Sequence, residues 1–210
     1  MNHNHTTDLV PELAAVEVAG MSRETFLVRG ALAAGAVYGT SMVSPFVRSA
    51  LAQAGTGDVD ILNFALTLEF LEADFYRRAQ KLSLSSDVAK IARSFGDAES
   101  QHVDALKATI KQLSGKPVAS PKFSFPMKDE KSFLKLAQTL EDTGVSAYNG
   151  AGPAIKSKEV LAAAGSIVQI EARHAAVIRL LRGLVPAPDA FDKSLGTAKV
   201  LAAVKPLIRA

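Results

Sequence analysis

The sequence predicts an all-α protein built around a four-helix bundle with one long crossover connection. Three observations support this fold class. Four long stretches place apolar residues at helical spacing, the connections between them are short, long and short, and one sequence pattern occurs twice. With 210 residues, 48% of them apolar, the chain suffices for one domain with a sizeable core. We divide it into an N-terminal segment (1–54), the bundle (55–184) and a C-terminal linker with a capping helix (185–210).

The N-terminal segment has the features of an export signal. Residues 1–20 are polar, then weakly apolar, and predict disorder or a short accessory helix. Residues 21–54 have a basic start, a short Ala- and Gly-rich run and small residues at Ala-x-Ala spacing. Residues 22–27 resemble a twin-arginine signal, although Glu24 replaces the second arginine. We expect an exported, periplasmic or extracytoplasmic protein; the alternative is a cytoplasmic protein that retains this segment as a helix. The run is too short for a stable membrane span.

Four helices are expected in the bundle, and turn-forming residues separate them. A break at 149–156, rich in Asn, Gly and Pro, follows the third helix, and Pro186 ends the fourth. Residues 115–128 contain three prolines and predict an extended crossover. Residues 197–209 have the spacing of a short capping helix. The four predicted helices are 58–82, 86–113, 131–148 and 157–184.

Polar residues on the helix faces that are predicted to be buried occur in a repeated pattern. Glu-x-x-His is found twice, and each copy is preceded by a glutamate 30 residues upstream, with a tyrosine seven residues after that glutamate. The two copies are offset by 72 residues. The first copy consists of Glu69, Tyr76, Glu99 and His102, and the second of Glu141, Tyr148, Glu171 and His174.

The spacing predicts that these residues meet inside the bundle. In an antiparallel helical hairpin, residues equidistant from the turn lie at the same height along the helices. The midpoint of Glu69 and Glu99 falls in the first turn, and the midpoint of Glu141 and Glu171 falls beside the second. Four adjacent buried carboxylates would have to take up protons unless cations bind them. We therefore predict two divalent ions, with Glu99 and Glu171 bridging, Glu69 and Glu141 terminal, and one histidine, His102 or His174, on each metal. Glu72 is the alternative first-helix ligand.

These residues carry a family resemblance. One Glu from each of two helices and Glu-x-x-His from each of the other two is the arrangement of the ferritin-like di-iron carboxylate proteins. Residues 62–76, 144–148 and 171–175 further resemble the exported ferritin-like branch that includes desiccation-related proteins. The resemblance spans about 58–184 and includes all six predicted ligand positions.

The ligand set predicts the metal and the chemistry. Carboxylates and imidazoles without sulfur favour two iron ions, with two manganese ions as the alternative and zinc less favoured. O2 or H2O2 is the expected small-molecule substrate. Tyr76 and Tyr148 are candidate catalytic residues that hydrogen-bond the terminal carboxylates and supply an electron; alternatively they are core aromatics with satisfied hydroxyls.

Three functional classes follow from this site. The first is a ferroxidase or peroxide-consuming oxidoreductase in oxidative or desiccation stress protection. The second is a manganese catalase, and the third is a non-enzymatic exported stress protein with a structural metal pair.

Composition excludes other classes. The chain has no cysteine, so disulfides and thiolate metal sites are excluded. The formal charge of +3 is scattered, without a basic cluster interleaved with aromatics, so no nucleic-acid partner is expected. The sequence is compatible with a homo-oligomer.

Overall fold

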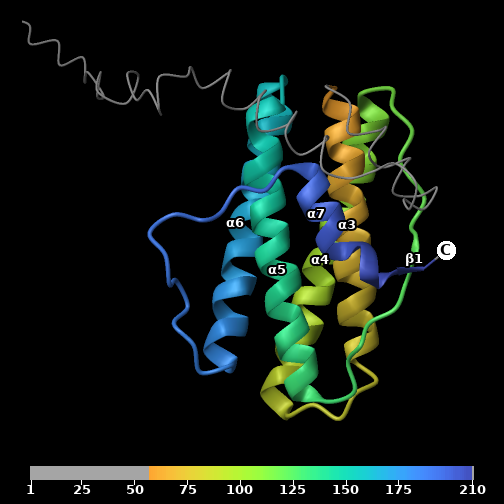
Figure 1. Cartoon of the computed structure of the whole chain (residues 1–210). Coiled ribbons are helices and arrows are strands. Elements are labelled where there is room, and N and C mark those ends of the chain that lie inside the picture. The colour runs from red at the N-terminus through yellow and green to blue at the C-terminus, as the bar shows by residue number, and fades with distance from the viewer. Residues whose placement is uncertain (1–56, 210) are drawn as a thin grey trace, which may run out of the picture. The chain divides into compact units, whose positions relative to one another are not determined.

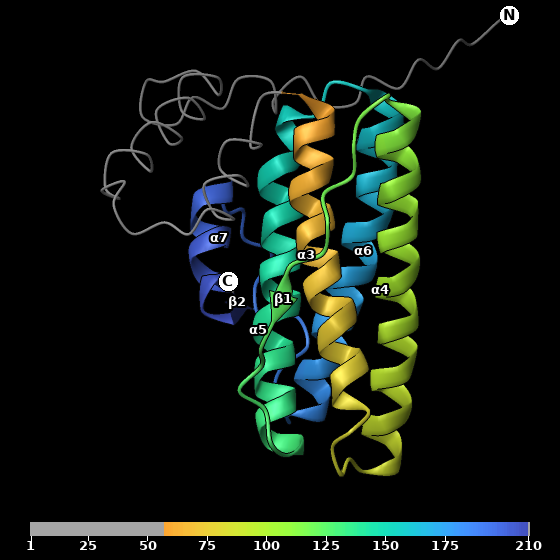
Figure 2. The same cartoon turned by 90° about the vertical axis from the view of Figure 1, so that its right-hand side faces the viewer.

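The computed structural model describes residues 57–209, in which four long helices lie side by side (Figures 1 and 2). The helices are α3 (Asp58–Ala79), α4 (Ser86–Gln112), α5 (Glu130–Ala151) and α6 (Lys158–Leu181). They form two hairpins, α3 with α4 and α5 with α6, which confirms the predicted all-α bundle. The predicted tail and export signal, residues 1–54, lie outside the described residues. Within the described residues, none of the helices combines the length and the apolar character that a bilayer crossing requires.

The crossover between the hairpins runs along the bundle and is fixed by polar and strand contacts (Figure 2). The side chain of Asn63 donates to the carbonyl of Lys116 at 3.1 Å and accepts from the backbone of Val118 at 2.8 Å. Further along, β1 (Lys122–Phe123) pairs antiparallel with β2 (Ile208–Arg209) near the C-terminus. The sequence did not predict these strands, because two residues are too few for an alternating pattern to show.

Three of the four long helices end three residues away from the predicted positions: α3 and α6 end earlier, at Ala79 and Leu181, and α5 ends later. Helix α5 continues beyond the predicted end at 148 to Ala151, and a 3-10 turn, η2 (Gly152–Ala154), follows it. Gly150 is helical, and the return segment lies directly over it: a Cβ at this position would lie 2.0 Å from the carbonyl oxygen of Leu195. The glycine therefore permits close packing and does not break the helix.

The C-terminal helix is shorter than predicted. Helix α7 (Thr197–Val204) gives way to η3 (Lys205–Leu207), because Pro206 cannot continue an α-helix, and the chain then enters β2. The buried face of α7 packs beside α5, which makes it the expected capping helix. Its buried residues are Val200, Leu201 and Val204.

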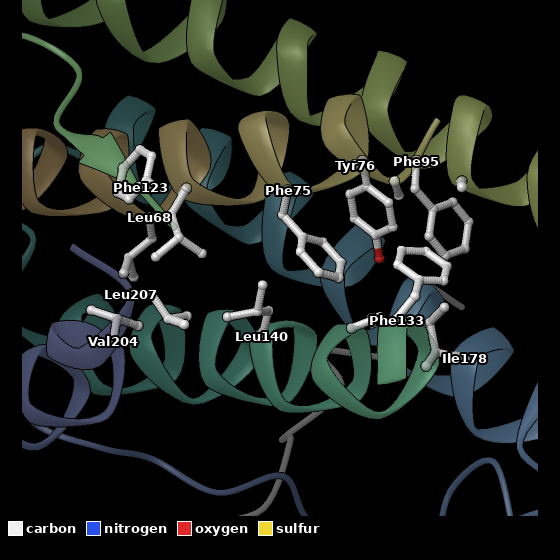
Figure 3. Packing of buried hydrophobic residues seen from close by; sticks show 14 of the residues in the cluster. Leu68, Phe75, Tyr76, Phe95, Phe123, Phe133, Leu140, Ile178, Val204 and Leu207 are labelled. Carbon is white, nitrogen blue, oxygen red and sulfur yellow. The ribbon is translucent and has the colours of Figure 1, made fainter. Parts of the chain in front are cut away.

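Aromatic rings form one part of the core, next to the centre of the bundle (Figure 3). The rings of Phe75 and Phe133 stack with centroids 5.2 Å apart, and Tyr76 meets Phe95 edge-on at 5.7 Å. This cluster includes Tyr76, whereas Tyr148 belongs to a second apolar cluster. Both tyrosines are thus anchored in apolar surroundings, which leaves their hydroxyls to reach polar partners.

Candidate metal centre

The six predicted ligand residues come together from all four long helices. Helices α3 and α5 contribute one glutamate each, whereas α4 and α6 contribute a Glu-x-x-His pair each. All four glutamates are fully buried, and the side chains of His102 and His174 are only 12% and 7% exposed. The glutamates are Glu69, Glu99, Glu141 and Glu171.

The ligand atoms fall into two overlapping sets. One set contains Glu69, Glu99, His102 and Glu171, and the other contains Glu99, Glu141, Glu171 and His174. Within each set, one ligand atom per residue lies within 4.8 Å of the others. Two residues, Glu99 and Glu171, belong to both sets, as bridging carboxylates would. The cluster therefore fits a di-metal site.

Both imidazoles point their Nδ1 atoms at the carboxylates. His102 Nδ1 lies 3.0 Å from Glu99 Oε2, 3.2 Å from Glu69 Oε2 and 3.3 Å from Glu171 Oε1. His174 Nδ1 lies 2.9 Å from Glu99 Oε1 and 3.5 Å from Glu141 Oε2. Each ring nitrogen thus faces the space that the carboxylate oxygens share, where a cation would replace a proton.

Burial and mutual repulsion shift the protonation equilibria of the carboxylates. Burial raises the pKa of Glu69 to about 7 and also raises the pKa of Glu141. Burial, together with the neighbouring carboxylates, raises the pKa of Glu171 well above its usual range. Burial acts in the same direction on Glu99, but its contacts with the two histidines outweigh this effect and lower its pKa to about 2. The four carboxylates therefore do not all ionise at neutral pH without added positive charge.

The histidines supply that positive charge in the absence of metal. Burial alone would lower their pKa values, but contacts with Glu171, Glu69 and Glu99 raise the pKa of His102 to about 12. Contacts with Glu141 and Glu99 likewise raise the pKa of His174 to about 10.

Several buried ligand atoms lack a hydrogen-bond partner among the described residues. They are Glu99 Oε1, Glu141 Oε2, both carboxylate oxygens of Glu171, and His174 Nδ1. The 2.9 Å contact between His174 and Glu99 is an ion pair without hydrogen-bond alignment. A buried polar atom without a partner is unfavourable by about 1–3 kcal/mol. Because these atoms are carboxylate oxygens and an imidazole nitrogen, two divalent cations would satisfy them.

The two tyrosines make reciprocal contacts across the bundle. The hydroxyl of Tyr76, on α3, donates to Glu141 Oε1 on α5. The hydroxyl of Tyr148, on α5, donates to Glu69 Oε1 on α3 at 2.5 Å. Burial raises the pKa of both hydroxyls well above the usual value, so both remain neutral donors. Each tyrosine therefore holds one carboxylate that belongs to a single ligand set.

Glu72, the alternative first-helix ligand, belongs to neither ligand set. It is nevertheless only 2% exposed, and burial, together with the charge of Glu171, raises its pKa well above the usual range. Of these two α3 glutamates, Glu69 is the one that belongs to a ligand set.

Phe95 is a residue of the site that sequence reasoning missed. Its ring stacks on the imidazole of His174, with centroids 3.7 Å apart and planes at 21°. Phe95 lies one helical turn before Glu99 on α4, so the i, i+4 spacing could have placed it on the ligand face. The stacking fixes the plane of the ring that carries the ligand nitrogen.

Replacing Phe95 with leucine tests this contact. Phe95→Leu keeps an apolar side chain, so the free energy of unfolding should fall by less than about 1.5 kcal/mol. Metal affinity should fall about tenfold because the His174 ring is no longer held in one plane. Metal titration and urea unfolding measure the two effects. Phe133→Leu, from the same aromatic cluster, is the matched control and should leave affinity unchanged; equal losses in both variants would contradict a specific role for Phe95.

Comparisons with known proteins agree with this architecture. The chain is similar to a conserved hypothetical protein from Mycobacterium tuberculosis whose structure is solved, with 18% identity, a TM-score of 0.57, and coverage of 66% of this chain and 99% of that chain. This likeness concerns the fold alone. A comparison with curated proteins gives no match. The family model for the ferritin-like domain matches residues 57–184, more than half of the sequence. The chain therefore belongs to the ferritin-like domain family.

Proposed function

We propose that this protein is a di-iron oxidoreductase of the ferroxidase or peroxide-consuming type, which uses O2 or H2O2. The observation that carries the proposal is the pair of overlapping ligand sets, each with three carboxylates and one imidazole, that share Glu99 and Glu171. A mixed oxygen and nitrogen ligand set is suited to redox-active iron, and to manganese as the alternative metal.

The proposed roles of the residues follow from their positions. Glu69 and His102 would hold one ion, Glu141 and His174 the other, and the two shared carboxylates would bind both. Iron held by these residues would supply the electrons for reduction of O2 or peroxide, and Fe(II) would become Fe(III). The hydroxyls of Tyr76 and Tyr148 hold the terminal carboxylates in place, and the buried surroundings exclude bulk water from the site.

Iron loading tests the proposal. Metal-free protein is loaded with Fe(II) without air and then exposed to O2 or H2O2. The expected result is two irons per chain and rapid Fe(II) oxidation, followed by absorbance in the near ultraviolet. Oxidation no faster than in buffer would contradict the proposal. Peroxide disproportionation by protein with bound Mn(II) would instead indicate a catalase, and bound metal without reactivity would indicate a structural pair.

Tyrosine substitutions test the two hydroxyls separately. Tyr76→Phe and Tyr148→Phe each remove one hydrogen bond to a terminal carboxylate and leave the ring in place. We expect metal affinity to fall by about tenfold or less, and the rate of Fe(II) oxidation to fall by about tenfold or more. Stopped-flow absorbance measures the rates. Thr139→Ala, which removes an exposed hydroxyl from α5 outside the ligand sets, is the control. Unchanged oxidation rates in both bundle variants would indicate that the two tyrosines are core aromatics without a role in the reaction.

We also propose that the protein acts outside the cytoplasm in protection against oxidative or desiccation stress. The support is the export-like sequence of residues 21–54 and the resemblance to the exported ferritin-like branch. Cell fractionation tests the localisation. Arg23→Ala should retain the protein in the cytoplasm, whereas Arg48→Ala, which removes the same charge outside the motif, should not. Cytoplasmic wild-type protein would contradict export.

A further inference from the structure

Glu72 departs from the twofold sequence repeat at the metal centre. The offset of 72 residues maps each of the four repeated residues of the first half onto an identical residue in the second, but it maps Glu72 onto Gly144. Glu72 lies one turn after Glu69 on α3, and Gly144 lies one turn after Glu141 on α5. The two halves of the site therefore differ at this position, where one helix carries a carboxylate and the other carries no side chain.

Gly144 makes room for two carboxylates. A Cβ at this position would lie 2.9 Å from Glu171 Oε2 and 3.3 Å from Glu72 Oε1. Both oxygens thus occupy the space that any other residue at 144 would fill. Glycine within a helix is less favourable than alanine by about 1 kcal/mol, so its presence in the interior of α5 calls for such a reason. The pairing of Glu72 with Gly144 places the Glu72 carboxylate beside Glu171, which belongs to both ligand sets.

The Glu72 carboxylate is buried, and one of its two oxygens is unpaired among the described residues. Its side chain is 2% exposed, and Oε2 has no hydrogen-bond partner within residues 57–209. A carboxylate with this degree of burial takes up a proton unless it is hydrogen-bonded, paired with a charge or bound to a metal. None of the basic side chains of the described region forms an ion pair with it. His102 lies 3.3 Å from Glu171 on the opposite helices, and a metal pair bound by Glu171 would bring further positive charge next to Glu72.

Glu72 also belongs to the pair of helices that carries no histidine ligand. Both histidines come from α4 and α6, whereas Glu72 and Gly144 come from α3 and α5. We propose that Glu72 is a seventh protein ligand, which contributes a carboxylate to the metal pair from the α3 and α5 side. The two metal positions are then chemically unequal, because only one half of the repeat carries this residue. This inference rests on the proposed di-metal site.

Co(II) titration of purified full-length protein tests the proposal. The visible absorption of bound Co(II) reports its ligands, and the titration reports affinity. Glu72→Gln keeps the size of the side chain and removes the anionic ligand. The expected result is a loss of affinity of tenfold or more for at least one ion, together with a changed Co(II) spectrum. Glu72→Asp, which withdraws the carboxylate by one methylene, should show the same losses.

Controls separate a loss of the ligand from a general loss of charge or of folding. Asp74→Asn removes one negative charge from α3 outside the cluster, where Asp74 pairs with Arg77 and Arg78, and should change neither affinity nor spectrum. Far-ultraviolet circular dichroism checks that each variant is folded. If Glu72→Gln binds Co(II) with wild-type affinity and spectrum, or loses affinity without a spectral change, Glu72 is not a ligand. If the wild-type protein itself binds no Co(II), Fe(II) or Mn(II), the proposed function fails as well.

Discussion

Glu171→Gln is expected to bind at most one metal ion per chain, to lose Fe(II) oxidation, and to be more stable than the wild type when metal-free. Glu171 belongs to both ligand sets, so its loss affects both metal positions. Neither of its carboxylate oxygens has a hydrogen-bond partner among the described residues, and three other ligand carboxylates surround it. A neutral amide relieves this repulsion, and the metal-free variant should gain about 1–3 kcal/mol in free energy of unfolding.

The same substitution should remove the stabilisation that metal confers. Saturating metal adds about 2.7 kcal/mol for each ion present at 100 times its dissociation constant. Wild-type protein should therefore gain stability from metal, and Glu171→Gln should gain little. Urea unfolding with and without metal measures both effects, and elemental analysis gives the stoichiometry. Asp104→Asn is the control, because its side chain is 82% exposed on α4. A metal-free variant that is less stable than the wild type would indicate that Glu171 is structural.

The arrangement of the bundle could be predicted because its signals are local. Each hairpin is set by its turn, and residues equidistant from the turn must meet at one level. Charged residues on an apolar helix face, such as Glu99 and Glu171, indicate burial that only a ligand or a proton can compensate. The repeat then relates the two hairpins without any knowledge of their packing.

The remaining features depend on contacts between segments that are distant in sequence. Gly150 has the local character of a helix breaker, but the reason for a glycine here is the close approach of the Leu195 backbone, which leaves no room for a side chain. Gly144 likewise acquires its meaning only when Glu72 and Glu171 are seen beside it. In the sequence, Phe95 has the helical spacing of an ordinary core residue. Its stacking on His174 depends on how α4 packs against α6.

Stability should depend on pH with opposite sign in the metal-free and metal-loaded protein. Burial raises the pKa of Glu69 from 4.5 to about 7, so the folded state binds more protons than the unfolded state between these values. Its stabilising contribution is complete below pH 4.5 and is lost as pH rises through 7, by about 3 kcal/mol. The pKa of His174, raised to about 10 from 6.5, extends the decline to higher pH. Glu99, with a pKa lowered to about 2, acts oppositely but only below pH 4.5. Metal-free protein should therefore be most stable near pH 4.5 and lose stability toward pH 8.

Metal reverses this trend because cations and protons compete for the same atoms. Raising the pH removes the competing protons, so apparent metal affinity and metal-linked stability both rise. Urea unfolding midpoints at pH 5, 6, 7 and 8, with chelator and with saturating Mn(II), give the two slopes. Glu69→Gln should flatten the metal-free slope between pH 5 and 7, because it removes the group that titrates there. If the metal-free protein instead becomes more stable from pH 5 to 8, its buried carboxylates are neutralised by something other than protons. The electrostatic argument for a cation site would then fail.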